Sequence, residues 1–163
     1  MRLVVLTALS AICLLSACQK AEEIATPEDV LAGMSKQLVM KKMLRICPAC
    51  RVKDEEGRTI IAGFSPGRFG EKNQFLVLHH SSDVILAVTV GFVYDDRDEA
   101  ERIYNDFVAA QTASDWKSGQ NEKGRCIYQK DENRVNDICL DLRLAKEFTV
   151  TFANQFSGFR QPG

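Results

Sequence analysis

The residues best suited to chemistry in this sequence are two closely spaced cysteines, Cys47 and Cys50, and two adjacent histidines, His79 and His80. A CxxC pair is typical of thiol oxidoreductases, and two cysteines with two histidines can also ligate a soft metal ion. Here the pair follows a predicted helix, whose carbonyl end disfavours a thiolate. Adjacent histidines on a strand point to opposite faces. We therefore expect a structural disulfide and no metal, with thiol redox or metal handling as the alternative.

The carboxylates do not form a catalytic pattern. They cluster in expected turns and helix starts, as in Asp95-Asp96 and Asp131-Glu132. The sequence has no nucleophile elbow, no glycine-rich phosphate loop and no HExxH motif. We therefore expect a protein that is not an enzyme and that carries no cofactor.

The N-terminal segment has the layout of a targeting signal. Arg2 precedes an apolar run from Leu3 to Leu15, which is shorter than the roughly 20 residues of a comfortable membrane span. The run leads into Leu15-Ser16-Ala17-Cys18, which resembles the lipobox of bacterial lipoproteins. An ordinary secretory signal or a short membrane helix is the alternative interpretation.

The lipobox resemblance implies a compartment. It implies that residues 1–17 are removed, that Cys18 is lipidated, and that residues 18–25 form a tether to the periplasmic side of a bacterial membrane. Gln19, where an Asp would retain the protein at the inner membrane, then favours the outer membrane.

The mature chain would keep an even number of cysteines: Cys47, Cys50, Cys126 and Cys139. In an oxidising compartment this predicts two disulfides, with three possible connectivities. Apolar alternation places Ile127 opposite Ile138 in a hairpin, which sets Cys126 opposite Cys139 on the other face. Opposed Cβ atoms in an antiparallel pair are about 4.5–5.5 Å apart, close to disulfide geometry. We therefore expect a Cys126–Cys139 bond and leave Cys47 to Cys50.

Hydrophobic periodicity predicts two amphipathic helices and six strands. The first helix begins at Thr26-Pro27 and stops before Pro48, and the second opens over residues 95–99. The expected strands are 59–64, 74–79, 84–94, 125–129, 138–142 and 148–154. Antiparallel strands with one apolar face need a cover, which the helices supply. We expect one α+β domain over residues 26–163, mostly antiparallel sheet, in the order α-βββ-α-βββ.

The two halves of this order, 26–94 and 95–163, share faint sequence similarity. Residues 57–61 resemble residues 124–128, and residues 88–90 resemble residues 150–152. A weak internal duplication is one interpretation of these matches. The α+β prediction does not depend on it.

Charge and loop composition bear on partners. Without residues 1–17 the chain carries 20 basic and 22 acidic side chains, a net of −2 that gives no case for nucleic acid. Aromatic and arginine side chains, the types that most often anchor protein interfaces, occur in turn-rich segments. These candidate interface residues are Arg68, Phe69, Trp116, Phe159 and Arg160.

The expected function is a lipid-anchored protein-binding module, such as an immunity protein, an inhibitor or an envelope-assembly lipoprotein. Its partner would be another envelope protein or a delivered protein. The alternative for each of the aromatic residues is that its side chain packs into a small satellite core.

Overall fold

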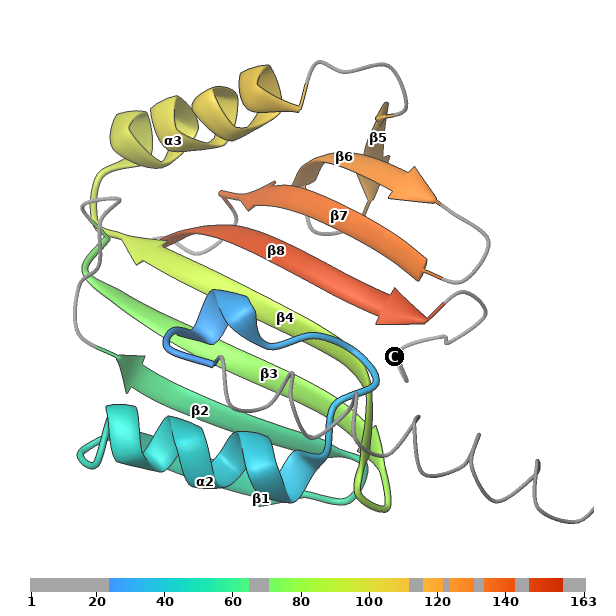
Figure 1. Cartoon of the computed structure of the whole chain (residues 1–163). Coiled ribbons are helices and arrows are strands. Elements are labelled where there is room, and N and C mark those ends of the chain that lie inside the picture. Colours follow the sequence, from blue (N-terminus) through green and yellow to red (C-terminus); the bar gives the residue numbers. More distant parts are fainter. Residues whose placement is uncertain are drawn as a thin grey trace, which may run out of the picture.

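The computed structural model of this protein describes residues 24–64, 71–111, 116–121, 124–130, 134–142 and 147–156. These residues form a short 3-10 helix, two α-helices and eight strands (Figure 1). The helices are η1 (Pro27–Asp29), α2 (Lys36–Ile46) and α3 (Arg97–Ala110). The strands are β1 (Arg51–Glu55), β2 (Arg58–Phe64), β3 (Asn73–Ser81), β4 (Val84–Tyr94), β5 (Lys117–Asn121), β6 (Gly124–Lys130), β7 (Arg134–Asp141) and β8 (Phe148–Phe156).

The eight strands form one antiparallel sheet in the order β1-β2-β3-β4-β8-β7-β6-β5. Strands β1 to β4 and strands β5 to β8 are each a meander of consecutive neighbours. Strand β4 joins the two meanders by pairing with β8, from Ala87 opposite Gln155 to Tyr94 opposite Phe148. Helix α2 precedes the first meander and α3 precedes the second. The predicted α+β class with a mostly antiparallel sheet is thus confirmed.

The predicted order of three strands after each helix is wrong by one strand in each half. Strands β1 and β5 form the two edges of the sheet, so the order is α-ββββ-α-ββββ. Four of the five residues of β1 are exposed, and β5 has the polar sequence KSGQN. Edge strands with charged or polar side chains resist pairing with other chains. The sequences of β1 and β5 show no apolar alternation. These two strands form through backbone pairing with β2 and β6.

The predicted first helix is split into η1 and α2. Gly33, between the two helices, has φ 95°, in the left-handed region that favours glycine. Its N–H donates to the carbonyl of Ile85 at 2.7 Å, and the Ile85 N–H donates to the carbonyl of Met34 at 3.0 Å. The backbone here therefore pairs with the start of β4 and cannot continue the helix begun at Thr26.

Helix α2 begins where a side chain from another segment caps it. The Asp83 carboxylate accepts hydrogen bonds from the Ser35 hydroxyl at 2.6 Å and from the Gln37 N–H at 2.8 Å. These bonds lower the pKa of Asp83, the bond from Ser35 most. The cap therefore stabilises the helix fully above the unfolded pKa of Asp83 and is lost as the pH falls through its lower folded pKa.

Among the described residues, no helix is both long and apolar enough to cross a bilayer.

The sheet has one helix-bearing face and one face, termed the open face, that carries no helix among the described residues. Helix α3 packs against β4, β7 and β8, and α2 lies in front of β1 and β2 (Figure 1). A row of apolar residues crosses the helix-bearing face: Ile61, Leu76, Val90, Phe152 and Ile138. On the open face, a Cβ at Gly91 would lie 2.0 Å from Cζ of Phe75, so the glycine makes room for that ring.

Both predicted disulfides are present. Cys126 lies opposite Cys139 in the β6–β7 register, beside the predicted pair of Ile127 and Ile138, and the two Cα atoms are 4.2 Å apart. The Cys47–Cys50 bond closes the turn between α2 and β1, with Cα atoms 5.3 Å apart. Apolar alternation was therefore sufficient to assign the hairpin register and, with it, the connectivity.

Candidate functional site: an apolar pocket beside Trp116

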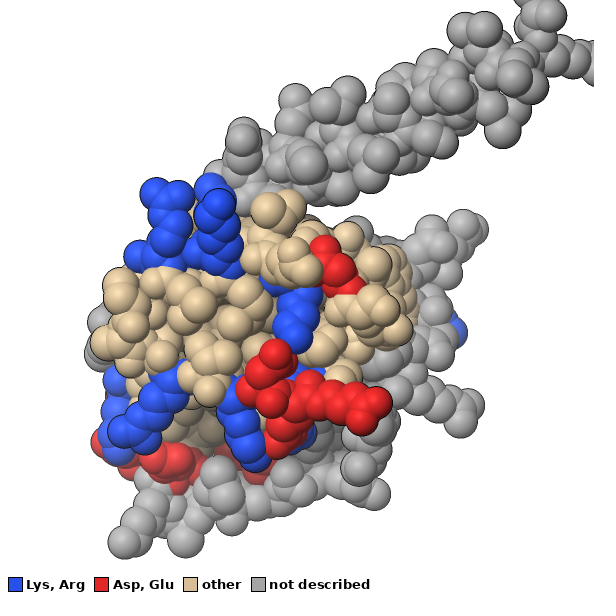
Figure 2. Space-filling view, turned by 90° about the horizontal axis from the view of Figure 1, so that it is seen from below, with Lys and Arg blue, Asp and Glu red and all other residues tan. Residues whose placement is uncertain are grey.

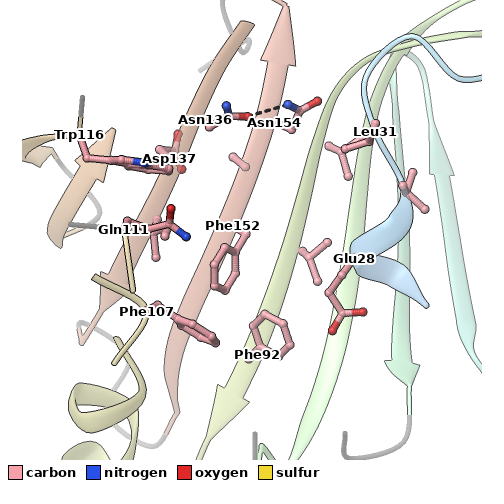
Figure 3. A pocket seen from close by; sticks show the side chains of 15 residues that line it. Glu28, Leu31, Phe92, Phe107, Gln111, Trp116, Asn136, Asp137, Phe152 and Asn154 are labelled. Carbon is pink, nitrogen blue, oxygen red and sulfur yellow. Dashed lines mark hydrogen bonds between the residues drawn. The ribbon is translucent and has the colours of Figure 1, made fainter. Parts of the chain in front are cut away.

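An apolar pocket of about 410 Å³ opens on the helix-bearing face, between η1 and the end of α3 (Figure 3). Strands β4, β8 and β7 form its floor. The apolar lining residues are Val30, Leu31, Val88, Val90, Phe92, Phe107, Trp116, Ile138, Phe152 and Ala153. The polar lining residues are Glu28, Gln111, Asn136, Asp137 and Asn154. Binding pockets are typically of this kind, concave and mostly apolar with a few polar groups, in volumes of about 300–1,000 Å³.

Three phenylalanines shape the interior of the pocket. Phe107 of α3 meets Phe152 of β8 edge to face, with ring centroids 4.5 Å apart and an interplanar angle of 80°. Phe152 meets Phe92 of β4 in the same way, at 5.6 Å and 85°. Each such pair contributes roughly 0.5–1.5 kcal/mol beyond the burial of area. Phe92 is fully buried, whereas Phe107 and Phe152 are only partly buried. The pocket therefore presents the partly exposed rings of Phe107 and Phe152, which are held in place by packing on each other and by the contact of Phe152 with the buried Phe92.

The opposite wall is the chain segment 24–35, which is tied to the sheet through two asparagines. The Ala32 N–H donates to Oδ1 of Asn154 at 3.0 Å. Nδ2 of Asn154 in turn donates to Oδ1 of Asn136 at 2.7 Å, the bond drawn in Figure 3. Val30 and Ala32, which belong to this segment, are buried. The wall is therefore packed against β8 and β7 and does not hang free over the pocket.

The pocket exists because the two halves of the fold are covered unequally. In the first half, segment 24–35 runs across the sheet before α2 begins. In the second half, β4 ends at Tyr94 and α3 begins at Arg97, so no covering segment precedes α3. The apolar floor between α3 and segment 24–35 carries aromatic side chains, and within the described part of the chain no backbone segment covers it.

The structure places one of the five predicted interface residues in this pocket. Trp116 is partly buried and lines the pocket just before β5. The other four lie in segments 65–70 and 157–163, outside the described residues: Arg68, Phe69, Phe159 and Arg160. The predicted lipidation site, Cys18, also lies outside them. These five assignments stay predictions.

Sequence reasoning missed the phenylalanines of the pocket. Phe107 belongs to the apolar stripe of α3, and Phe92 and Phe152 alternate with their neighbours in strands, so all three look like ordinary core residues. A local signal for a pocket does not exist in these segments. Phe92 and Phe152 become neighbours only through the pairing of β4 with β8, between residues 60 positions apart.

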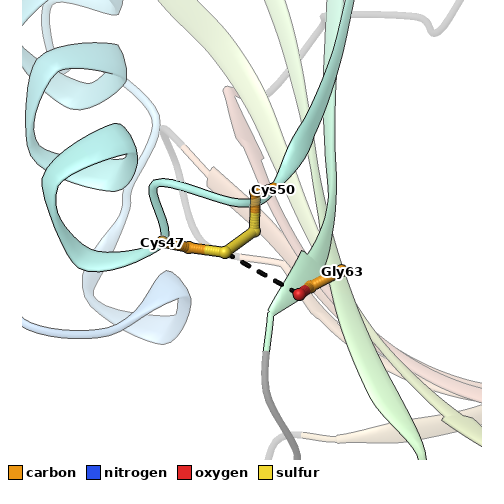
Figure 4. The surroundings of a disulfide bond; sticks show 3 residues. All are labelled: Cys47, Cys50 and Gly63. Carbon is orange, nitrogen blue, oxygen red and sulfur yellow. Dashed lines mark hydrogen bonds between the residues drawn. A yellow bond between two sulfur atoms is a disulfide. The ribbon is translucent and has the colours of Figure 1, made fainter.

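The cysteine and histidine residues that suggested redox or metal chemistry are not brought together. Sγ of Cys47 lies 3.7 Å from the carbonyl oxygen of Gly63, at one end of β2 (Figure 4). Nε2 of His80 lies 3.0 Å from Oγ1 of Thr59, at the other end of β2. Within the described residues, no group of three or more His, Cys, Asp or Glu side chains is arranged to hold a metal ion.

His80, Thr59 and Asp54 form a hydrogen-bonded chain that superficially looks like a catalytic group. The Thr59 hydroxyl donates to Asp54 and also contacts His80. Burial, followed by the nearby Lys36 ammonium, lowers the pKa of His80, with a smaller opposite effect from Asp54. Thr59 is completely buried, so a substrate could not reach its hydroxyl. The chain of contacts therefore joins β1, β2 and β3.

The fold and the pocket together define an α+β protein with a one-sided antiparallel sheet and an apolar pocket on its helix-bearing face. No protein-family model, no curated protein and no solved structure matches this chain at a significant level.

Proposed function

We propose that this protein is a lipid-anchored envelope protein that acts by binding another protein, without catalysis. In this proposal the partner inserts apolar side chains into the pocket beside Trp116. The observation that carries the proposal is the pocket: Phe107, Phe152 and Trp116 are only partly buried although they sit in a concave, apolar setting. Aromatic residues in such positions carry a large share of the free energy of protein binding.

The polar groups around the pocket support a protein partner. Gln111 lies beside Trp116 at one end, and Glu28 lies at the other end, as Figure 3 shows. Protein interfaces typically combine a desolvated apolar centre with a polar rim that can pair with backbone or side-chain groups. An amide and a carboxylate bracketing aromatic rings provide that combination.

The anchor part of the proposal predicts the result of a single substitution. Because the lipid would attach to the sulfur of Cys18, Cys18→Ser should abolish lipidation and membrane retention, since stable anchoring needs more than one buried acyl chain. Mass spectrometry of the N-terminal peptide and cell fractionation after a high-salt wash measure the two effects. A Cys18→Ser protein that is still acylated and retained would contradict the anchor.

The pocket part predicts a selective loss of partner binding. Trp116→Ala should weaken the purified partner complex at least about tenfold, which is 1.4 kcal/mol, because truncating an interface anchor removes apolar contact. Isothermal titration calorimetry measures the loss. The matched control is Tyr128→Ala, which removes an aromatic side chain from an exposed position of β6, where Tyr128 follows the inward-facing Ile127. The control variant should bind as the unmodified chain does.

Trp116 is the one tryptophan of the chain, so it can also report directly on the pocket. The ¹⁹F signal of 5-fluorotryptophan at this position should shift when the partner binds. An unchanged signal with full partner binding would place the interface elsewhere. A shift that occurs only with an apolar small molecule, and with no protein, would indicate that the pocket binds a small ligand.

We infer further that the two halves, 26–94 and 95–163, arose by duplication. The support is the repeated order of one helix and a four-strand meander, and a sheet whose order reads symmetrically outward from β4 and β8. The faint matches between 57–61 and 124–128 fall on β2 and β6, which occupy the same place in each half. In this proposal, the halves later diverged in the segment before the helix, which covers the sheet in the first half and is missing before α3 in the second.

A further inference from the structure

We propose that the face formed by α2 and β1 rests on an anionic phospholipid surface. The proposal goes beyond the pocket and does not depend on it. The first observation is a segregation of charge along the chain. The 24 residues from Val30 to Lys53 contain six Lys and Arg and no Asp or Glu. The rest of the chain holds 15 of the 21 basic and all 22 acidic side chains, a net of −7.

Helix α2 presents two of its four cations on the side away from the core. Val39 and Met43, on one side of the helix, are completely buried. Lys41 and Arg45 lie on the other side and are exposed. Neither forms an ion pair with any described residue. Their charges are therefore available to an external anionic partner.

Aliphatic side chains accompany these cations. Leu38, Leu44 and Ile46 of α2 are 38%, 40% and 42% exposed. Val52 is also 40% exposed, on β1, the edge strand in front of which α2 lies (Figure 1). Exposed aliphatic and basic residues together are typical of segments that lie in the interface of a lipid bilayer, where the apolar groups enter the headgroup boundary. A purely charge-paired protein contact would not require them.

The Cys47–Cys50 turn makes α2 and β1 one surface. It joins the end of the helix directly to Arg51, which is exposed at the start of β1. Figure 2 views this side of the molecule and shows Lys and Arg on two flanks of an uncharged surface. The surface ends where acids begin, at Asp54, which pairs with Lys36 at 2.9 Å, and at Glu55.

This orientation would leave the pocket exposed to the periplasm. Strand β1 is one edge of the sheet, and β8 and β7 are its fourth and fifth neighbours. At about 4.8 Å between strands, the pocket floor begins roughly 15 Å from the lipid-facing edge, at β4, and extends to roughly 25 Å from it, at β7. A partner protein could then approach the pocket while α2 stays on the membrane.

Vesicle binding tests the proposal on the chain from Gln19 to Gly163, which keeps every described residue and lacks the lipidation site. This protein should sediment with vesicles of phosphatidylglycerol in phosphatidylcholine, and much less with phosphatidylcholine alone. Binding should weaken as salt is added, because screening shortens electrostatic attraction. Each Lys or Arg near an anionic surface contributes a factor of about five, so Lys41→Gln with Arg45→Gln should lower the partition coefficient about 25-fold.

The matched control removes the same two charges from α3. Arg97→Gln with Arg102→Gln changes two well-exposed arginines far from the face and should leave vesicle binding within about twofold. Equal losses in the two double variants would show an effect of net charge only and would overturn the proposal. So would vesicle binding that ignores the lipid charge, or binding of an acidic protein but not of vesicles. Trp116→Ala should keep full vesicle binding, which separates this result from the pocket proposal.

Discussion

Replacing Cys126 and Cys139 together by alanine is expected to lower the free energy of unfolding by about 3 kcal/mol. The bond closes a loop with a sequence separation of 13 and so restricts the unfolded chain substantially. Alanine suits the test because both positions are buried, at 6% and 4% exposure, and accept an apolar side chain. Urea unfolding at equilibrium measures the change.

The second disulfide supplies the comparison for this prediction. The Cys47–Cys50 bond has a sequence separation of only 3, for which the same chain-entropy relation gives about 2 kcal/mol. The double alanine variant of this pair should therefore be the more stable of the two. A larger loss from Cys47 and Cys50 would show that the bond between α2 and β1 holds the native state together, and that loop entropy is the lesser effect.

A substitution at Gly124 is expected to be at least as damaging. Gly124 has φ 130°, and an added Cβ would lie 2.2 Å from the carbonyl oxygen of Leu140 in β7. That neighbour is backbone, held in the sheet by the pairing of Arg125 with Leu140, so it cannot turn aside. Gly124→Ala should lower the free energy of unfolding by at least about 3 kcal/mol, as strain and overpacking add.

Gly63→Ala separates the two contributions. Gly63 also has a left-handed backbone, with φ 97°, but an added Cβ would meet no described atom within 4 Å. This variant should lose only the conformational part, about 1–2 kcal/mol. Thermal and urea unfolding of both variants give the comparison. Equal losses would mean that β6 moves away from Leu140 without difficulty, and the close packing inferred at Gly124 would be wrong.

The two surfaces proposed for binding lie on different parts of the fold. The pocket is built from β4, β7, β8 and α3, whereas the basic face is built from α2 and β1. Segment 24–35 links them, since it forms a wall of the pocket and then leads into α2. Because no residue of α2 or β1 lines the pocket, a change at one surface can be tested without removing residues of the other.

The sequence by itself determined the features that depend on near neighbours. A strand-like apolar run predicted β4 at residues 84–94, and apolar alternation set Ile127 opposite Ile138 and so paired Cys126 with Cys139. The acids before Arg97 predicted the start of α3, where Asp96 accepts from the N–H of Asp98 at 2.7 Å. Each of these rests on side-chain direction or capping within a few residues, which local sequence encodes.

Tertiary structure alone decided the break in the first helix, the edge strands and the pocket. The helix begun at Thr26 stops because Gly33 pairs with Ile85, a residue 52 positions away. Strands β1 and β5 form by backbone pairing with β2 and β6, and their side chains carry no apolar pattern that could announce them. The pocket needs β4 beside β8, which places Phe92 and Phe152 in contact. Periodicity tells which face of a strand is apolar, but it does not tell which distant strand will pair with it. The partner is chosen only when the whole sheet buries its apolar face.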